Sequence, residues 1–202
     1  MIGIVDYGVG NLFSLKSSLK YLGLEHIVSA DMRELARCDR LILPGVGAFG
    51  DARAILAGSG MDGFLTEQAR SGKPLLGICL GMQLLLQGSE EFGSHDGLGL
   101  IEGRACPLKG DIDPLLKVPH MGWNSLHFTK KSELFKYSRE GEWVYFVHSF
   151  YGKGCGGDVL ATADYSVPVT AAVGRDKVFG TQFHPEKSGT AGLKILRAFA
   201  EV

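Results

Sequence analysis

A cysteine held between two glycines is the feature of this sequence best suited to covalent chemistry. The apolar run 74–78 leads directly into a G-x-C-x-G pattern centred on Cys79, and a helix-forming run follows at once. This is the cysteine form of the nucleophile elbow, in which a sharp strand-to-helix turn presents the nucleophile at the edge of a sheet. We expect only glycine to fit at Gly77 and Gly81. The start of the helix favours the thiolate, and the backbone N–H of Leu80 is left free to donate to an oxyanion.

The alternative for Cys79 is a small buried core residue, which is the usual environment of an unpaired cysteine. Glycine on both sides at a strand-to-helix step favours the nucleophile instead.

A thiolate nucleophile needs a base, and the base needs a group that orients it. Two of the six histidines, His148 and His184, lie in apolar segments that look like strands. His184 is the better base because Pro185 restricts the backbone after it and Glu186 could bond the imidazole and fix its tautomer. His148 is either a half-buried strand histidine bonded to the backbone or a residue that shapes the substrate pocket, and the sequence leaves both open.

A second oxyanion donor should come from a loop beside the elbow. The glycine-rich segment Pro44–Gly50 follows an apolar strand that we expect to lie next to the strand before Cys79. Glycine permits backbone conformations that turn N–H groups into a site. Such loops also bind phosphates, but this one has neither the G-x-G-x-x-G nor the lysine-bearing phosphate-loop pattern. Nucleotide binding is therefore not favoured, and Phe49 is expected in the core.

The first half of the chain alternates apolar strands with amphipathic helices, which predicts a parallel sheet covered on both faces. The predicted strands are Ile2–Val5, His26–Ser29, Arg40–Leu43 and Pro74–Ile78. The predicted helices are Asn11–Leu22, a short helix that begins at Asp31, and Met61–Ser71. Asp31 and Glu34 also have the spacing of a capping box, in which each side chain would bond the other residue's backbone N–H.

The second half of the chain has closely spaced strands with turn residues between them, which indicates antiparallel pairing. The predicted strands are Val144–Phe150, Val159–Ala163, Pro168–Val173 and Val178–Gln182, and a final helix covers Ser188–Val202. No linker or internal repeat interrupts the chain, so one domain is expected.

Composition argues against several classes of function. A formal net charge of −1, from 21 basic and 22 acidic residues, gives no electrostatic case for nucleic acid or an anionic membrane. The first eight residues resemble a strand rather than a signal peptide, and no window approaches the ~20 apolar residues of a membrane span. The four cysteines are widely spaced without a C-x-x-C pair, which argues against a zinc site or a disulfide framework. The cytoplasm is therefore the expected location.

Three motifs together resemble the triad-type class I glutamine amidotransferases: the elbow GICLGMQLL, the loop PGVGAFG and the segment HPEKSG. More narrowly, the chain resembles the glutaminase subunits of imidazole glycerol phosphate synthase, an enzyme of histidine biosynthesis. This narrower match rests on DYGVGN at 6–11, GLGLI at 97–101, VPHMGWN at 118–124, YFVHSF at 145–150 and Lys187-Ser188. The segment Lys153–Gly157 departs from the family's strand spacing, and we expect it to lengthen a surface turn.

The resemblance implies a flavodoxin-like α/β fold of the class I amidotransferase type, formed by a single glutaminase domain over residues 1–202. Its central sheet should be largely parallel and flanked by helices, with antiparallel strands in the C-terminal half. Cys79 would attack the side-chain amide carbon of glutamine, His184 would act as acid and base, and Glu186 would orient the histidine. The implied oxyanion contacts are Leu80, Val46 and Gly47, and the implied substrate contacts are Gly47, Gln83, His148, Ser149 and Phe150. No metal and no cofactor is implied.

The resemblance also implies a partner, a (β/α)8-barrel cyclase that receives the ammonia within a heterodimer and makes imidazole glycerol phosphate. Asn11, Trp123 and Lys187 match positions that the family places at this interface, although Trp123 could also be a core aromatic. Two other functions stay open: the glutaminase subunit of another synthase, such as anthranilate or pyridoxal phosphate synthase, and a non-catalytic partner subunit. The PHMGWN and DYGVGN segments argue against the first, and the presence of all three triad residues argues against the second.

Overall fold

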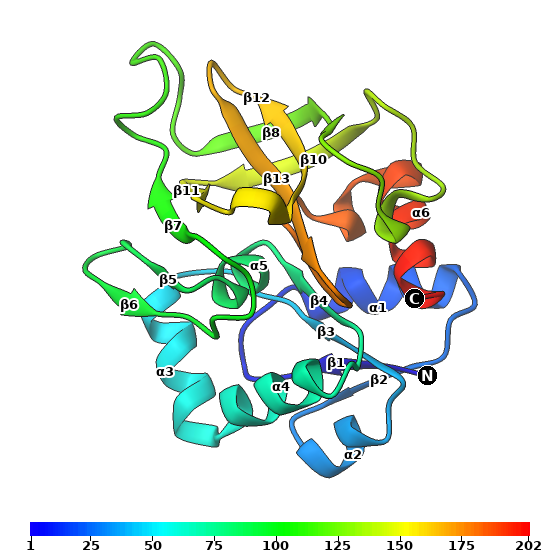
Figure 1. The fold of residues 1–202 in the computed structure, drawn as a ribbon. Coiled ribbons are helices and arrows are strands. Elements are labelled where there is room, and N and C mark those ends of the chain that lie inside the picture. Colours follow the sequence, from blue (N-terminus) through cyan, green and yellow to red (C-terminus); the bar gives the residue numbers. More distant parts are fainter.

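The computed structural model describes all residues from 1 to 202 and is built around one eight-stranded sheet (Figure 1). In spatial order the strands are β2 (His26–Ser29), β1 (Ile2–Val5), β3 (Arg40–Leu43), β4 (Leu75–Ile78), β14 (Val178–Thr181), β13 (Pro168–Arg175), β12 (Val159–Asp164) and β9 (His127–Phe128). The first five pair in parallel, and the last three continue the sheet in antiparallel pairs. The order 2-1-3-4 at its start is that of flavodoxin-like folds, so the predicted fold class is confirmed.

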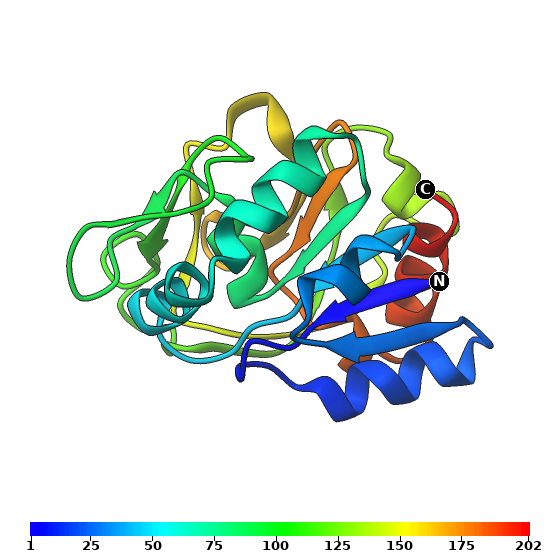
Figure 2. The same ribbon diagram turned by 90° about the horizontal axis from the view of Figure 1, so that it is seen from below.

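Helices cover both faces of the parallel part of the sheet (Figures 1 and 2). They are α1 (Leu12–Tyr21), α2 (Met32–Ala36), α3 (Phe49–Ser59), α4 (Met61–Arg70), α5 (Leu80–Leu85) and α6 (Gly189–Ala200). The strand residues alternate between two cores, as a period of two requires. Ile42 packs with α1 and α6 on one face, while Leu41 and Leu43 pack with α2 to α5 on the other.

Two smaller sheets stand beside the main one. β8 (His120–Ser125) and β10 (Trp143–His148) form an antiparallel ribbon. The other sheet has four strands, β11 (Phe150–Lys153), β7 (Arg104–Pro107), β5 (Gly88–Ser89) and β6 (His95–Asp96). Three short 3₁₀ helices, η1 (Glu133–Phe135), η2 (Gly156–Asp158) and η3 (Pro185–Lys187), complete the fold.

The structure corrects the prediction of one strand over Val144–Phe150. β10 ends at His148 and β11 begins at Phe150, because the chain leaves the ribbon with β8 at Ser149 and pairs with β7 instead. The glycine-rich loop is also shorter than predicted, since α3 already begins at Phe49.

The predicted capping box at α2 is only half formed. Asp31 Oδ1 accepts the backbone N–H of Arg33 at 2.7 Å, as an N-cap should. The backbone N–H of Asp31 donates to the Ser29 hydroxyl at 2.9 Å, and this hydroxyl donates to Glu34 Oε2 at 2.6 Å. The Ser29 hydroxyl therefore bridges the Asp31 N–H and Glu34, which the capping-box pattern predicts to be in direct contact.

Close packing around α5 explains the glycines of the elbow. All six residues of α5 are buried. A Cβ atom on Gly81 would lie 1.9 Å from the carbonyl oxygen of Leu43, and one on Gly77 would lie 2.6 Å from the Gly81 carbonyl. The helix thus touches β3 backbone to backbone, which no other residue type would allow.

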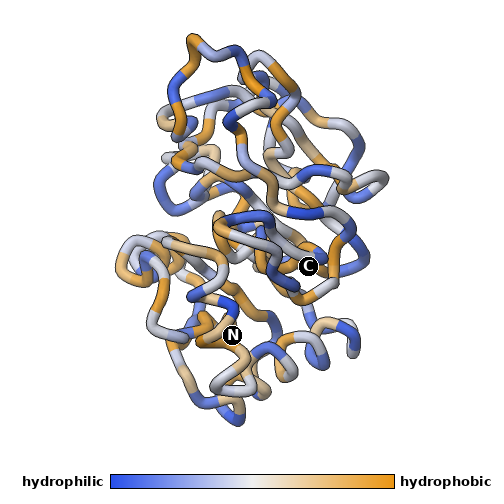
Figure 3. Tube along the Cα trace, turned by 90° about the vertical axis from the view of Figure 1, so that its left-hand side faces the viewer, coloured by the Kyte–Doolittle hydropathy of each residue, from blue (hydrophilic) through white to orange (hydrophobic).

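None of the helices is both long and apolar enough to cross a membrane. Apolar and polar residues instead alternate over short distances along the trace in Figure 3.

Replacing Gly81 by alanine should destabilise the fold by about 3 kcal/mol, because the new methyl group would overlap the Leu43 carbonyl. Gly58→Ala, in α3, is the matched control. No atom lies within 4 Å of its Cβ position, so the added helix propensity should stabilise the protein by roughly 0.5–1 kcal/mol. Urea unfolding of both variants measures the difference, and a Gly81→Ala protein as stable as the wild type would contradict the packing argument.

Candidate active site

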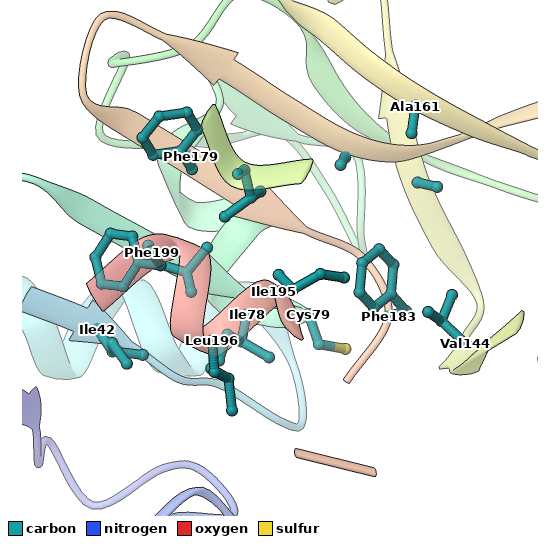
Figure 4. Close-up of a cluster of buried hydrophobic side chains, with 14 of the residues drawn as sticks. Ile42, Ile78, Cys79, Val144, Ala161, Phe179, Phe183, Ile195, Leu196 and Phe199 are labelled. Carbon is teal, nitrogen blue, oxygen red and sulfur yellow. The ribbon is translucent and has the colours of Figure 1, made fainter. Parts of the chain in front are cut away.

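Cys79 lies at the step between β4 and α5 in a strained backbone conformation. Its φ of 55° and ψ of −108° are outside the common regions for a residue with a side chain, and such a conformation costs about 1–3 kcal/mol. The backbone N–H donates to Thr181 O at 2.7 Å, which holds the turn against β14. The side chain stands at the margin of one core beside Ile78 and Phe183, with its sulfur pointing away from Ile78 (Figure 4).

His184 and Glu186 complete a buried triad with this cysteine. The His184 side chain lies close enough to Cys79 for the sulfur to raise the pKa of the ring, and its Nδ1 bonds Glu186 Oε1 at 2.8 Å. Both side chains of the His184–Glu186 pair are only 3% exposed. The backbone fixes the histidine as well, because its N–H donates to Tyr145 O and its carbonyl accepts the Ser188 hydroxyl at 2.6 Å.

The charge state of His184 follows from these contacts. Burial lowers its pKa, but the hydrogen bonds and charges of Cys79 and Glu186 outweigh burial and raise the pKa to about 10. The ring is therefore an imidazolium at neutral pH, a charge that favours the thiolate, the form in which a cysteine attacks an amide carbon.

A cavity of about 420 Å³ opens over the sulfur. Its walls contain every residue that the sequence analysis named for the oxyanion or the substrate: Val46, Gly47, Leu80, Gln83, His148, Ser149 and Phe150. They come from the loop after β3, from α5 and from the junction of β10 and β11. The cavity also has three walls that the sequence analysis did not select, formed by Glu91, Pro119 and Val147.

Gln83 faces this cavity with a defined amide orientation. Its Nε2 donates to Phe150 O at 3.1 Å and to Gln182 Oε1 at 3.1 Å. Because a carbonyl oxygen can only accept, the NH2 group must point this way. The Oε1 atom of Gln83 is left as an acceptor for a ligand.

Glu91 is the charged residue that sequence reasoning missed. It lies between β5 and β6, and its Oε2 accepts the backbone N–H of Phe49 at 2.5 Å. This contact caps α3, whose own N-cap residue, Ala48, has no side chain that could do so. No spacing in the sequence connects Glu91 to the elbow, since two-residue strands leave no periodic signal.

His148 lines the cavity but is not a base. Its Nδ1 donates to Phe150 O at 2.8 Å, and its Nε2 lies 3.0 Å from His120 Nδ1. Burial lowers the pKa of His148 to about 3 and that of His120 to about 4, so both rings are neutral at neutral pH. The two interpretations of His148 left open by the sequence are compatible: the ring is satisfied by the backbone and also forms a cavity wall.

Two of the three residues predicted for a partner interface meet on one aromatic ring. Trp123 is 52% exposed, so it is not a core aromatic, and its ring lies edge-on to Tyr145 at 6.1 Å. Lys187 Nζ stands 5.9 Å from the centre of the same Tyr145 ring. Asn11 is the N-cap of α1, where its Oδ1 accepts the Ser14 N–H at 3.4 Å.

No group of three or more His, Cys, Asp or Glu side chains is arranged to hold a metal ion. The four cysteines are all unpaired, and Cys155, next to the turn at Lys153–Gly157, is buried.

Known proteins that this chain resembles in sequence and in fold include glutamine amidotransferases and HisH subunits. The family described as glutamine amidotransferase class-I matches residues 3–202. Imidazole glycerol phosphate synthase subunit HisH of Geobacillus thermodenitrificans is 53% identical over 206 residues, which span 100% of this chain and 96% of the relative. The subunit of the same name from Bacillus velezensis is 52% identical with the same coverage. A crystal structure titled glutamine amidotransferase superimposes with a TM-score of 0.77 at 20% identity, covering 100% of this chain and 99% of the other, and supports the fold.

Titration of the histidines tests the charge assignments. Nitrogen-15 NMR of the side chains should show His184 protonated across the neutral range and losing its proton only as the pH rises through about 10. His120 and His148 should stay neutral until the pH falls to about 4 and about 3. In Cys79→Ala the pKa of His184 should move toward the ordinary value of about 6.5, because one contact that raises it is lost. A neutral His184 in the wild type at neutral pH would contradict the ion pair.

Proposed function

The chain belongs to the class I glutamine amidotransferases, and within them to the HisH subunits of imidazole glycerol phosphate synthase, so we propose that it releases ammonia from glutamine for a partner subunit. The observation that carries this proposal is the Cys79–His184–Glu186 triad, whose cysteine and histidine line the 420 Å³ cavity. The identity of about 50% to the HisH relatives over the full chain supports imidazole glycerol phosphate synthase over another synthase.

In the first step the Cys79 thiolate attacks the side-chain amide carbon of glutamine. A C–S bond forms, the C–N bond breaks, and the imidazolium of His184 gives its proton to the departing nitrogen, which leaves as ammonia. In the second step His184 takes a proton from water while the water oxygen bonds the acyl carbon. The C–S bond then breaks, and glutamate and the thiolate are regenerated. Glu186 holds the ring in place through both steps.

The developing negative oxygen needs donors on the cavity wall. The backbone N–H of Leu80, the first residue of α5, is one of them, because the first N–H groups of a helix have no partner within it. The peptides of Val46 and Gly47 provide the second. Gly47 has a φ of 94°, and no atom lies within 4 Å of the position that its Cβ would occupy. This peptide can therefore change its orientation with little steric resistance.

The polar walls match the α-amino acid end of glutamine. The α-ammonium group meets Gln83 Oε1 and the Glu91 carboxylate, two acceptors on one side of the cavity. The α-carboxylate meets the backbone at Ser149 and Phe150, and His148 bounds the same end of the cavity.

The partner that receives the ammonia is a (β/α)8-barrel cyclase, bound as a heterodimer through a surface that includes Asn11, Trp123 and Lys187. Exposure of Trp123 and its contact with Tyr145, shared with Lys187, support a common surface for two of these residues. We treat residues 1–202 as one glutaminase domain, which the match of the family over residues 3–202 supports. Location in the cytoplasm stays a prediction from the sequence.

Cys79→Ala should lower glutamate release by roughly 10⁴- to 10⁶-fold, because it removes the only thiol that lines the cavity. Cys106→Ala is the matched control, since Cys106 is a partly exposed cysteine that does not line the cavity. Steady-state glutamate release in the presence of the partner measures both variants. The proposal fails if Cys79→Ala keeps substantial activity while Cys106→Ala loses it.

Glutamine hydrolysis should be slow in the free subunit and should rise when the partner carries its own ligand, because ammonia without an acceptor is lost. Lys187 follows the triad glutamate directly, so it joins the interface to the active site. Lys187→Ala should reduce the stimulation more than the basal rate, by a factor within the ~5–150-fold range of such couplings.

Lys177→Ala, on the exposed turn between β13 and β14, is the control for loss of a lysine charge. Glutamate release is measured with and without the cyclase and its ligand. A free subunit that already runs at the stimulated rate would show that the glutaminase is not gated.

A further inference from the structure

Besides His184, the sulfur of Cys79 has two polar neighbours, the carbonyl oxygen of Val147 at 4.0 Å and the side-chain amide of Gln182. Gln182 Nε2 lies 3.7 Å from Cys79 Sγ, within hydrogen-bond distance for sulfur. Gln182 follows the last residue of β14, and its exposed fraction is 0%. It does not line the cavity, so it reaches the sulfur from the protein interior and leaves the cavity side open to the substrate.

A chain of hydrogen bonds fixes which end of the Gln182 amide faces the sulfur. Phe150 O can only accept, so Gln83 must present its NH2 group to it, and the same Nε2 then donates to Gln182. Gln182 must receive this bond with Oε1. Its own NH2 group is therefore turned to Cys79, as a donor.

The acceptor Phe150 O is itself held in place. His148 Nδ1 donates to it at 2.8 Å, and His148 Nε2 accepts from His120 Nδ1 at 3.0 Å. Asn124 Nδ2 lies 3.3 Å from His120 Nε2 and donates to Asp164 O at 2.8 Å. Because both rings are neutral, each has one donor and one acceptor nitrogen, and the network has one consistent arrangement.

We propose that Gln182 is a further catalytic residue, whose side-chain N–H donates to the Cys79 sulfur and stabilises it whenever it carries negative charge. The proposal deepens the proposed glutaminase function and rests on it. The sulfur is charged when it attacks as the thiolate, and again when the C–S bond of the thioester breaks and the electron pair remains on sulfur. In the thioester itself the sulfur is neutral and accepts a hydrogen bond more weakly. The hydrogen bond from Gln182 is therefore stronger before the thioester forms and after it breaks than in the thioester itself.

The same hydrogen bonds connect the residue that binds the α-amino end of the substrate with the nucleophile. Gln83, which offers Oε1 to the α-ammonium group, uses its Nε2 to orient the amide of Gln182, which in turn contacts the nucleophile.

The test is the pH dependence of Cys79 alkylation by iodoacetamide, with the modified peptide identified by mass spectrometry. Gln182→Met keeps the length of the side chain and removes the donor. We expect the pH of half-maximal rate to rise by about one unit, and the rate at any pH well below that midpoint to fall about tenfold. Glutamine kinetics should show a similar loss in kcat with KM changed less than about threefold, because Phe150 O still holds Gln83.

Thr181→Val is the matched control, one residue earlier on the same strand. The Thr181 hydroxyl is buried without a partner, so its removal should leave the alkylation profile unchanged. A Gln182→Met profile that coincides with that of the wild type overturns the proposal. Alkylation needs no glutamine, so a wild type that alkylates with the expected profile yet releases no glutamate would refute the glutaminase function alone.

A measurement on the unmutated Gln182 covers the case in which Gln182→Met does not fold. The side-chain NH2 resonances of Gln182 should shift with pH as the sulfur changes its charge, and this shift should be absent in Cys79→Ala. Resonances with the same pH dependence in both proteins would show that the amide does not contact the sulfur, and would overturn the proposal.

Discussion

The backbone contact between Gly81 of α5 and the carbonyl of Leu43 in β3 is the constraint on which the site depends. It brings the start of α5 so close to the sheet that Cys79 must adopt a positive φ. The surrounding packing maintains this strain, because all of α5 is buried and the N–H of Cys79 is bonded to β14. The cysteine, the loop after β3 and the histidine after β14 then meet at the carboxyl ends of adjacent parallel strands, where ligands bind in open α/β sheets.

Local hydrogen bonding, and not burial alone, decides the charge of the three buried histidines. His184 has an acidic partner on each side and is protonated, whereas His120 and His148 have only neutral partners and a backbone carbonyl and are not. One cationic ring therefore stands beside the sulfur, and a neutral pair orients the backbone that forms the opposite wall. A catalytic acid and a fixed scaffold are thus made from the same residue type in one small region.

Features of the structure that depend on a few neighbouring residues could be predicted from the sequence. The four N-terminal strands, the elbow around Cys79 and the Glu186 that follows His184 each have local signatures in apolar runs, glycine or spacing. Contacts that depend on the tertiary fold could not be predicted from the sequence. Glu91 reaches the cavity from the turn between two strands of two residues each. The strand predicted through Ser149 divides because its two halves pair with different strands. The contact of Gln182 with the sulfur depends on a side-chain amide from another element, and no sequence spacing encodes it.

The central claim is that Cys79 is the nucleophile of a glutaminase, and covalent trapping tests it most directly. A diazo ketone analogue of glutamine places its diazo carbon where the amide nitrogen would lie. Once this carbon has taken a proton, which the His184 imidazolium can give, the thiolate should displace N2 from it and form a stable thioether. Mass spectrometry of the digested protein should find one adduct per chain, on Cys79, formed in step with loss of glutamate release and prevented by excess glutamine. An adduct on Cys38, Cys106 or Cys155 that accompanies the loss of activity would falsify the assignment.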